Sequence, residues 1–67
     1  MTDSCTIKKR IQKLRSELNM SQSEVSRNLG INLSLYQRYE YGQSQPNVGR
    51  AIRIAEILQT TPQAIWG

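Results

Sequence analysis

Two helix-start signals and the turn between them constrain the fold of this chain more than any other feature. Ser21 followed three residues later by Glu24 is a capping box, in which each side chain bonds a backbone amide that the first helical turn leaves free. Gly30 can adopt the positive φ that ends such a helix, and Asn32 can cap the next one. The pattern therefore predicts two short helices, the second over 33–41, joined by a tight turn.

One helix is expected before this pair and two after it. The first carries apolar residues at the spacing of one buried stripe and is expected to end near Asn19, which tolerates the left-handed conformation of a C-cap. The members of that stripe are Ile7, Ile11, Leu14 and Leu18. Asn47 can cap a fourth helix over 48–58, and Thr61-Pro62 opens a short fifth, because proline is favoured at the first helical position. Strand-type alternation is absent, so the chain is predicted to be all-α, with five helices.

The length and charge of the chain bound its function. Its 67 residues form one small domain over 1–67, with residues 1–5 expected to be a flexible N-terminus. An enclosed substrate pocket would compete with the core of such a domain for the same few apolar residues. Nine Lys and Arg against five Asp and Glu give a net charge of +4 without any His, a balance that is common in domains that bind nucleic acid.

The sequence carries no sign of catalysis or export. Cys5 has no second cysteine to pair with, and neither a metal-ligand cluster nor a phosphate-binding glycine loop occurs. We therefore expect no enzymatic activity, no cofactor and no small-molecule ligand. No apolar run of about 18 residues and no signal peptide is present, so a soluble cytoplasmic protein without membrane contact is expected.

The third expected helix divides into an apolar and a polar side. At about 100° per residue, Leu35, Tyr36 and Tyr39 share one side. The opposite side carries Ser34, Gln37, Arg38 and Tyr41, with Leu33 beside them. Such side chains suit base edges or phosphates, and the chain around them is basic, which points to DNA. The alternative interpretation is an ordinary solvated helix face.

The span from Leu14 to Trp66 resembles the helix-turn-helix domain of phage repressors and Cro proteins, the lambda-repressor-like or Xre family. The resemblance is carried by Ser21-Gln22-x-Glu24-Val25-Ser26, Gly30, Tyr36-x-x-Tyr39-Glu40, Gly42, Gln45-Pro46-Asn47, Ala55-x-x-Leu58 and Thr61-Pro62-x-x-Ile65-Trp66. It implies a compact five-helix domain whose second and third helices form the helix-turn-helix. Three positions depart from the family pattern: Ser26 replaces Ala, Asn19 replaces Gly, and Leu33 is apolar where polar residues are frequent.

The resemblance implies which residues contact DNA. In this family the third helix enters the major groove, with its N-terminal residues nearest the bases. The implied base-reading residues are Asn32, Leu33, Ser34, Gln37 and Arg38. The implied phosphate contacts are Gln22, Arg15, Tyr41, Gln43, Ser44, Gln45 and Asn47. Gln37 could pair with adenine and Arg38 with guanine or a phosphate; the loop residues could equally be a plain polar connector.

The resemblance also implies a partly buried ion pair between Arg15 and Glu40, which would join the first helix to the third. Loss of Glu40 is then expected to lower stability without changing sequence preference. A basic run at the start of the chain has no comparable assignment; it consists of Lys8, Lys9, Arg10 and Lys13. It is expected to be the wet side of the first helix, where it still favours approach to a polyanion.

A weak homodimer, formed either in free solution or only on DNA, is predicted from the C-terminal part of the chain. Ile57 lies off the apolar stripe of its helix, in the region that the family uses for two-fold contacts, together with Trp66. A dimer of this kind implies a roughly palindromic operator whose half-sites lie about 34 Å apart, one helical turn of DNA.

Three functions from different classes are compatible with these patterns. The first is a sequence-specific transcription regulator, most simply a Cro-type repressor, acting on double-stranded operator DNA in the nucleoid of a bacterium or phage-infected cell. The second is the DNA-binding domain of a longer lysogeny repressor or of an antitoxin. The third is a small protein-interaction module without a DNA role, against which the polar face of the third helix argues.

Overall fold

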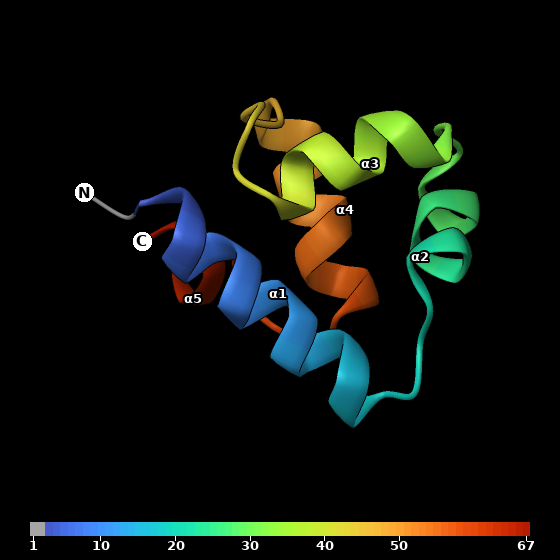
Figure 1. The fold of residues 1–67 in the computed structure, drawn as a ribbon, viewed down its shortest axis with the longest axis horizontal. Helices are drawn as coiled ribbons and strands as arrows, with labels where there is room; N and C mark the ends of the chain where they lie inside the picture. Colours follow the sequence, from blue (N-terminus) through green and yellow to red (C-terminus); the bar gives the residue numbers. More distant parts are fainter. Residues whose placement is uncertain (1–2) are drawn as a thin grey trace.

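The computed structural model describes residues 3–67, which form five α-helices connected by short loops (Figure 1). They are α1 (Ser4–Glu17), α2 (Gln22–Leu29), α3 (Leu33–Glu40), α4 (Val48–Ile57) and α5 (Pro62–Trp66). No strand occurs among the described residues, so the predicted all-α class and the number of helices are confirmed.

Each helix begins with a side chain that accepts a hydrogen bond from a backbone amide of its first turn. Four of these caps, Ser21, Asn32, Asn47 and Thr61, are the ones that the sequence predicts. The fifth is Asp3, whose Oδ1 accepts from Thr6 N at 2.8 Å and starts α1 at Ser4. Of the expected flexible N-terminus, residues 3–5 therefore form a cap and the first helical turn, while residues 1 and 2 lie outside the described residues.

The two turns that the sequence marks have left-handed backbone. Asn19, directly after the C-cap of α1, has φ 55°, and Gly30, the C-cap of α2, has φ 73°. Asparagine is one of the few side chains that occupy this region readily, which explains how it can stand where the family has glycine.

The core lies where α4 meets α2 and α5 and where α1 covers α3 and α5. Its buried apolar residues are Ile11, Val25, Tyr36, Tyr39, Ile54, Ala55, Leu58 and Ile65. Arg10 joins the first and last helices, because its Nη1 donates to the carbonyl oxygen of Ile65 at 3.1 Å. This packing holds α2 and α3 together at one end of the molecule (Figure 1).

Candidate nucleic-acid interface

The exposed side of α3 carries most of the residues that the sequence assigns to base reading. Tyr36, Tyr39 and Glu40 are buried and attach the opposite side of the helix to the core. The exposed residues are Asn32, Leu33, Ser34 and Arg38. Leu33 keeps 39% of its surface exposed and is not among the residues that pack against the core. The outer side of α3 is therefore not covered by the rest of the described chain.

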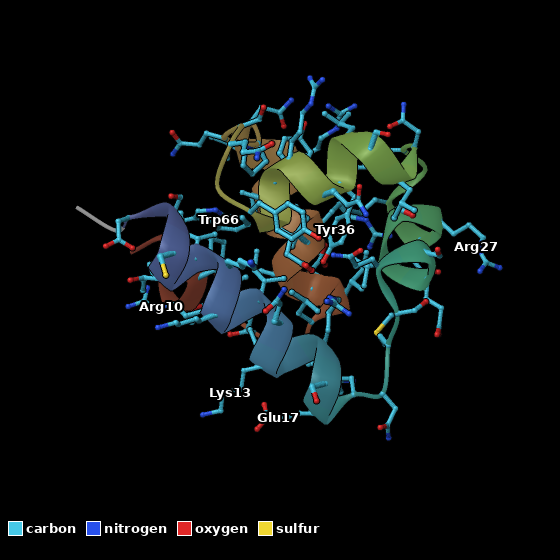
Figure 2. The ribbon with its side chains drawn as sticks, viewed as in Figure 1. Arg10, Lys13, Glu17, Arg27, Tyr36 and Trp66 are labelled. Carbon is cyan, nitrogen blue, oxygen red and sulfur yellow. The ribbon has the colours of Figure 1, made fainter. Side chains whose placement is uncertain are left out.

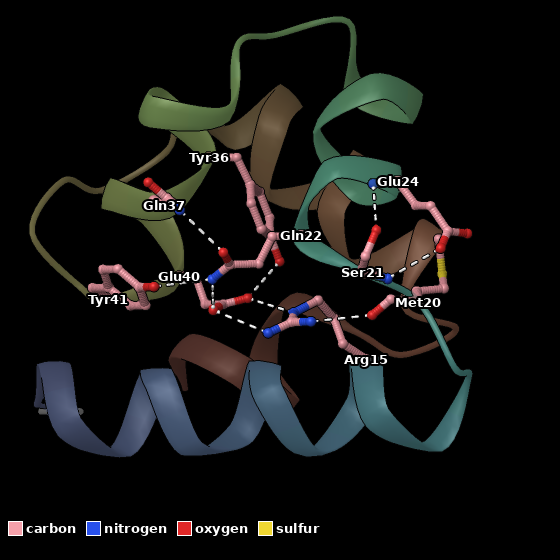
Figure 3. Close-up of polar contacts among 9 residues, drawn as sticks. All are labelled: Arg15, Met20, Ser21, Gln22, Glu24, Tyr36, Gln37, Glu40 and Tyr41. Carbon is pink, nitrogen blue, oxygen red and sulfur yellow. Dashed lines mark hydrogen bonds and ion pairs between the residues drawn. The ribbon is translucent and has the colours of Figure 1, made fainter.

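Gln37 differs from these four because it is half-buried at the edge of the helix. Its Nε2 donates to Oε1 of Gln22, at the start of α2, at 3.1 Å (Figure 3). This bond joins the two helices of the helix-turn-helix directly. It also holds one side of the Gln37 amide and leaves Oε1 and one N–H for a ligand.

Gln22 is in turn held by two groups at the C-terminal end of α3. Its Nε2 donates to Oε2 of Glu40 at 2.6 Å and to the hydroxyl of Tyr41 at 3.1 Å. Because an ionised carboxylate only accepts hydrogen bonds, Glu40 obliges Gln22 to turn its Nε2 inward and its Oε1 toward Gln37. The orientation of both amides therefore follows from the buried carboxylate (Figure 3).

The carboxylate of Glu40 is fully buried and accepts four hydrogen bonds. Arg15 donates two of them, from Nε to Oε1 at 2.6 Å and from Nη2 to Oε2 at 3.2 Å. Tyr36 donates its hydroxyl proton to Oε1 at 2.9 Å, and Gln22 supplies the fourth. The ion pair between α1 and α3 is thus present, with two further donors that the sequence analysis did not assign.

These contacts determine the charge state of the cluster. Burial by itself would raise the pKa of Glu40, but the hydrogen bonds from Arg15, Gln22 and Tyr36 outweigh burial and hold that pKa below its ordinary value. Burial, helped by the neighbouring carboxylate, raises the pKa of the Tyr36 hydroxyl, which therefore stays protonated and a donor. Glu40 is ionised at neutral pH.

Two of the residues expected to contact phosphates have their side chains engaged inside the protein. Arg15 donates hydrogen bonds from Nε and Nη2 to Glu40 and from Nη1 to the carbonyl oxygen of Met20, the last at 3.1 Å. Gln22 uses both hydrogens of its amide group as described. For Gln22, the groups left for an anion are the backbone amides at the start of α2, which a helix leaves unpaired.

The other expected phosphate contacts lie on the loop between α3 and α4. Gln43, Gln45 and Asn47 are exposed, while Ser44 is half-buried and Pro46 is buried, which anchors the loop. Tyr41 is half-buried, and its hydroxyl can still donate its own proton because it accepts the bond from Gln22.

The basic residues of α1 divide between two sides of the helix. Nζ of Lys8 lies 5.2 Å from the centre of the Tyr41 ring, so this positive charge borders the loop residues. Lys9 is exposed, as is Lys13, which points away from the helices, whereas Arg10 lies against α5 (Figure 2). Of the four basic residues at the start of the chain, only Lys8 therefore lies beside the candidate interface.

The two residues expected at a dimer interface pack against the core. Ile57 and Trp66 are both half-buried and contact the cluster of buried apolar residues. The large apolar residues that remain exposed on α4 are Val48 and Ile52, which the sequence analysis did not single out.

A helix-turn-helix family model matches residues 11–65 of the chain. The chain belongs to the lambda-repressor-like helix-turn-helix family. This helix-turn-helix protein is also similar to the transcriptional repressor RstR of the cryptic phage CTXphi in Vibrio cholerae serotype O1, with 30% identity over 61 residues. The aligned region covers 91% of the chain and 54% of RstR, so the chain spans about half the length of that curated relative. No solved structure matches it significantly.

The family assignment makes the chain a helix-turn-helix domain of DNA-binding regulators. Residues 3–67 contain no group of three or more His, Cys, Asp or Glu side chains placed to hold a metal ion. None of the helices described is long and apolar enough to cross a membrane. Of the residues in the site, sequence reasoning missed Tyr36 as a donor to Glu40, although the four-residue spacing that puts two side chains on one helix face was visible.

Proposed function

We propose that this helix-turn-helix domain binds a specific sequence of double-stranded DNA and regulates transcription, most simply as a Cro-like repressor that occupies a palindromic operator as a dimer. One observation carries the proposal: α3 presents an uncovered polar side, while its other side is locked to the core by Tyr36, Tyr39 and Glu40. A rigidly held helix with free polar side chains suits insertion into the major groove.

The bonding of Gln37 supports a role in reading adenine. A bidentate contact to adenine needs one acceptor and one donor on the same amide, for N6–H and N7 respectively. Gln37 retains Oε1 and one N–H after its bond to Gln22, which also prevents the amide from rotating freely. Arg38, exposed beside it, can pair with guanine O6 and N7 or with a phosphate, and Leu33 can contact a thymine methyl.

Contacts to the DNA backbone would flank this side. The free amides at the start of α2, the exposed loop residues Gln43, Gln45 and Asn47, and the hydroxyl of Tyr41 are available to phosphate oxygens. These groups and Ser44 position the helix without reading sequence. The side chain of Arg15 contributes mainly through its bonds to Glu40.

The repressor role is supported by the similarity to RstR, itself named a transcriptional repressor. A bound domain of this kind can block RNA polymerase by occupying the operator. Because the chain spans about half the length of RstR, a second candidate is the DNA-binding part of a longer regulator. Both versions make the same prediction for DNA binding.

Selection of binding sites from random duplexes tests the proposal. The expected result is an enriched palindromic motif whose half-sites lie about 34 Å apart. This spacing exceeds the longest dimension of one copy, which is 28 Å. No enrichment of any sequence would refute the proposed function.

Two variants then test the reading of Gln37. Gln37→Ala is expected to relax preference at one position of each half-site, at a cost of about 1–3 kcal/mol. Gln22→Leu removes the hydrogen bond to Gln37 but leaves Gln37 itself in place. It is expected to relax the base preference at the same position to a smaller extent. Equal weakening on every sequence would instead make Gln37 a phosphate contact.

A further inference from the structure

A chain of three hydrogen-bonded side chains leads from the buried carboxylate of Glu40 to the exposed edge of α3. Oε2 of Glu40 accepts from Nε2 of Gln22 at 2.6 Å, and Oε1 of Gln22 accepts from Nε2 of Gln37 at 3.1 Å (Figure 3). Glu40 is fully buried, and both glutamines are half-buried. Because each amide has an acceptor at one end and a donor at the other, the direction of one amide determines the direction of the next.

Only one direction of this chain is compatible with a carboxylate at position 40. An ionised carboxylate has no hydrogen to donate, so Gln22 must turn its nitrogen inward and its oxygen outward. That oxygen needs a donor, so Gln37 turns its own nitrogen toward Gln22 and keeps Oε1 free. The second hydrogen of Gln22 Nε2 goes to the hydroxyl of Tyr41, which can accept or donate and so resists neither direction.

The surroundings of the cluster hold this direction firmly. Every buried side-chain nitrogen and oxygen among the described residues has a hydrogen-bond partner. Turning Gln22 alone would therefore bring two oxygens together at Glu40 and two nitrogens together at Gln37. Such mismatched buried groups cost more than an ordinary hydrogen bond contributes, so the wild-type chain does not reverse.

We infer that Glu40 is a positioning residue for base recognition: its buried carboxylate sets which donor and acceptor Gln37 presents to DNA, and thereby the base read at that position, without touching DNA itself. The inference rests on the proposed function, in which Gln37 reads a base edge. It gives Glu40 a role beyond its ion pair with Arg15. The family resemblance predicts that loss of Glu40 leaves sequence preference unchanged, whereas the hydrogen-bond chain predicts a change at one position.

The substitution Glu40→Gln is expected to reverse the chain while keeping its size. Oε1 of Glu40 accepts from Arg15 Nε at 2.6 Å and from the Tyr36 hydroxyl, whereas Arg15 Nη2 lies 3.2 Å from Oε2. The oxygen of the new amide is therefore expected at the Oε1 position and its nitrogen at the Oε2 position, facing Gln22. Two donors cannot bond each other, so Gln22 turns its oxygen inward and its nitrogen toward Gln37.

This reversal changes what Gln37 offers to a base. In the wild type, its Oε1 and one N–H are free, which matches the N6–H donor and the N7 acceptor of adenine. After Glu40→Gln, Oε1 of Gln37 accepts from Gln22, and both N–H groups are free. Two donors match guanine, whose O6 and N7 are both acceptors. The preference at this position is therefore expected to move from adenine toward guanine.

The test measures affinity for four duplexes that differ only at the base that Gln37→Ala shows to be read, at a temperature where circular dichroism shows each variant folded. Glu40→Gln is expected to lower the ratio of affinity for adenine to affinity for guanine about tenfold, without changing preference elsewhere in the half-site. Arg15→Lys is the matched control, because it weakens the same ion pair but leaves the carboxylate in place. It should keep the wild-type ratio.

Two further variants show whether Glu40 acts through Gln22. In Gln22→Leu, which has no amide between the two ends of the chain, adding Glu40→Gln is expected to leave the ratio unchanged. The double variant Arg15→Met, Glu40→Gln removes the guanidinium that Glu40→Gln leaves without a counter-charge. It keeps the exchange of acceptor for donor at position 40, so it should show the same shift toward guanine even where Glu40→Gln alone is too unstable to bind.

Several results would overturn the role of Glu40 in base recognition alone. They are an unchanged ratio in the folded variants that carry Glu40→Gln, an equal shift in Arg15→Lys, and a shift that persists in Gln22→Leu. Sequence-selective binding that Gln37→Ala does not alter at any base would overturn it too, because Gln37 would then read no base. Absence of any selective binding by wild type would instead refute the proposed function, and this inference with it.

Discussion

Replacement of Glu40 by alanine is the sharpest test of how α3 is held. The substitution removes a buried carboxylate that accepts four hydrogen bonds, two from Arg15 and one each from Gln22 and Tyr36. It leaves the Arg15 side chain, which is only 16% exposed, without its counter-charge, and the buried Tyr36 hydroxyl without its acceptor. Removing one partner of a buried ion pair costs about 3–5 kcal/mol.

That loss is large for a domain of this size. At about 0.05–0.15 kcal/mol per residue, a chain of 67 residues has a total stability of about 3–10 kcal/mol. Each kcal/mol shifts the melting temperature of so small a domain by about 4–8 °C, so Glu40→Ala should lower it by at least about 12 °C. Thermal melting at neutral pH, followed by far-ultraviolet circular dichroism, measures the change.

Two controls separate the ion pair from a general effect of losing an acid. Glu17→Ala removes an exposed carboxylate of α1 and should change stability by less than about 0.5 kcal/mol. The double variant Arg15→Met, Glu40→Leu removes both charges of the ion pair. It should recover part of the stability that is lost when Glu40 alone is replaced. A melting temperature for Glu40→Ala within about 4 °C of wild type would refute the assigned role of the network.

Three further predictions concern pH, the turns and salt. The folded protein holds the pKa of Glu40 below the ordinary value of 4.5, so this carboxylate contributes its full stabilisation above pH 4.5. That stabilisation is lost as the pH falls from 4.5 toward the lower pKa of the folded state. Urea midpoints that stay constant through this acid range would contradict the prediction. Gly42→Ala should lower the free energy of unfolding in urea by about 1–3 kcal/mol more than Gly30→Ala does. Both glycines have φ 73°, but only a Cβ at Gly42 would overlap the first turn of α1. Equal losses of stability in the two variants would refute this reason. Lys8→Ala should reduce the steepness of log K against log salt by about one, because Lys8 borders the candidate interface, whereas Lys13→Ala, on the side away from it, should not; equal slopes for the two variants would show that Lys8 lies no nearer to the DNA than Lys13 does.

The boundaries of the helices were largely predictable because they depend on interactions within one turn. Ser21 and Glu24, Asn32 and Asn47 each bond an amide three residues away, so the signal and the effect lie in the same short stretch of sequence. The start of α1 was missed for a local reason as well, since the cap of Asp3 on Thr6 has the same form but lies ahead of the first apolar residue.

The face of α3 was predictable for a similar reason, but the state of its residues was not. Helical periodicity correctly separated the inward Tyr36 and Tyr39 from the outward Ser34 and Arg38. It could not show that Gln37 is half-buried and bonded to a residue fifteen positions earlier. That bond exists only because the packing of α2 on α3 brings the two amides together.

The sequence by itself determined the all-α class, the turn between α2 and α3, and the ion pair that its family resemblance implied. These follow from capping, from helical period and from a motif whose residues lie at set spacings. Only the tertiary structure decided that Glu40 orients Gln22 and, through it, Gln37, and that α4 exposes Val48 and Ile52 while Ile57 packs inward. The reason is physical: hydrogen bonds and burial between separate helices depend on how those helices are placed in space, which no local pattern specifies.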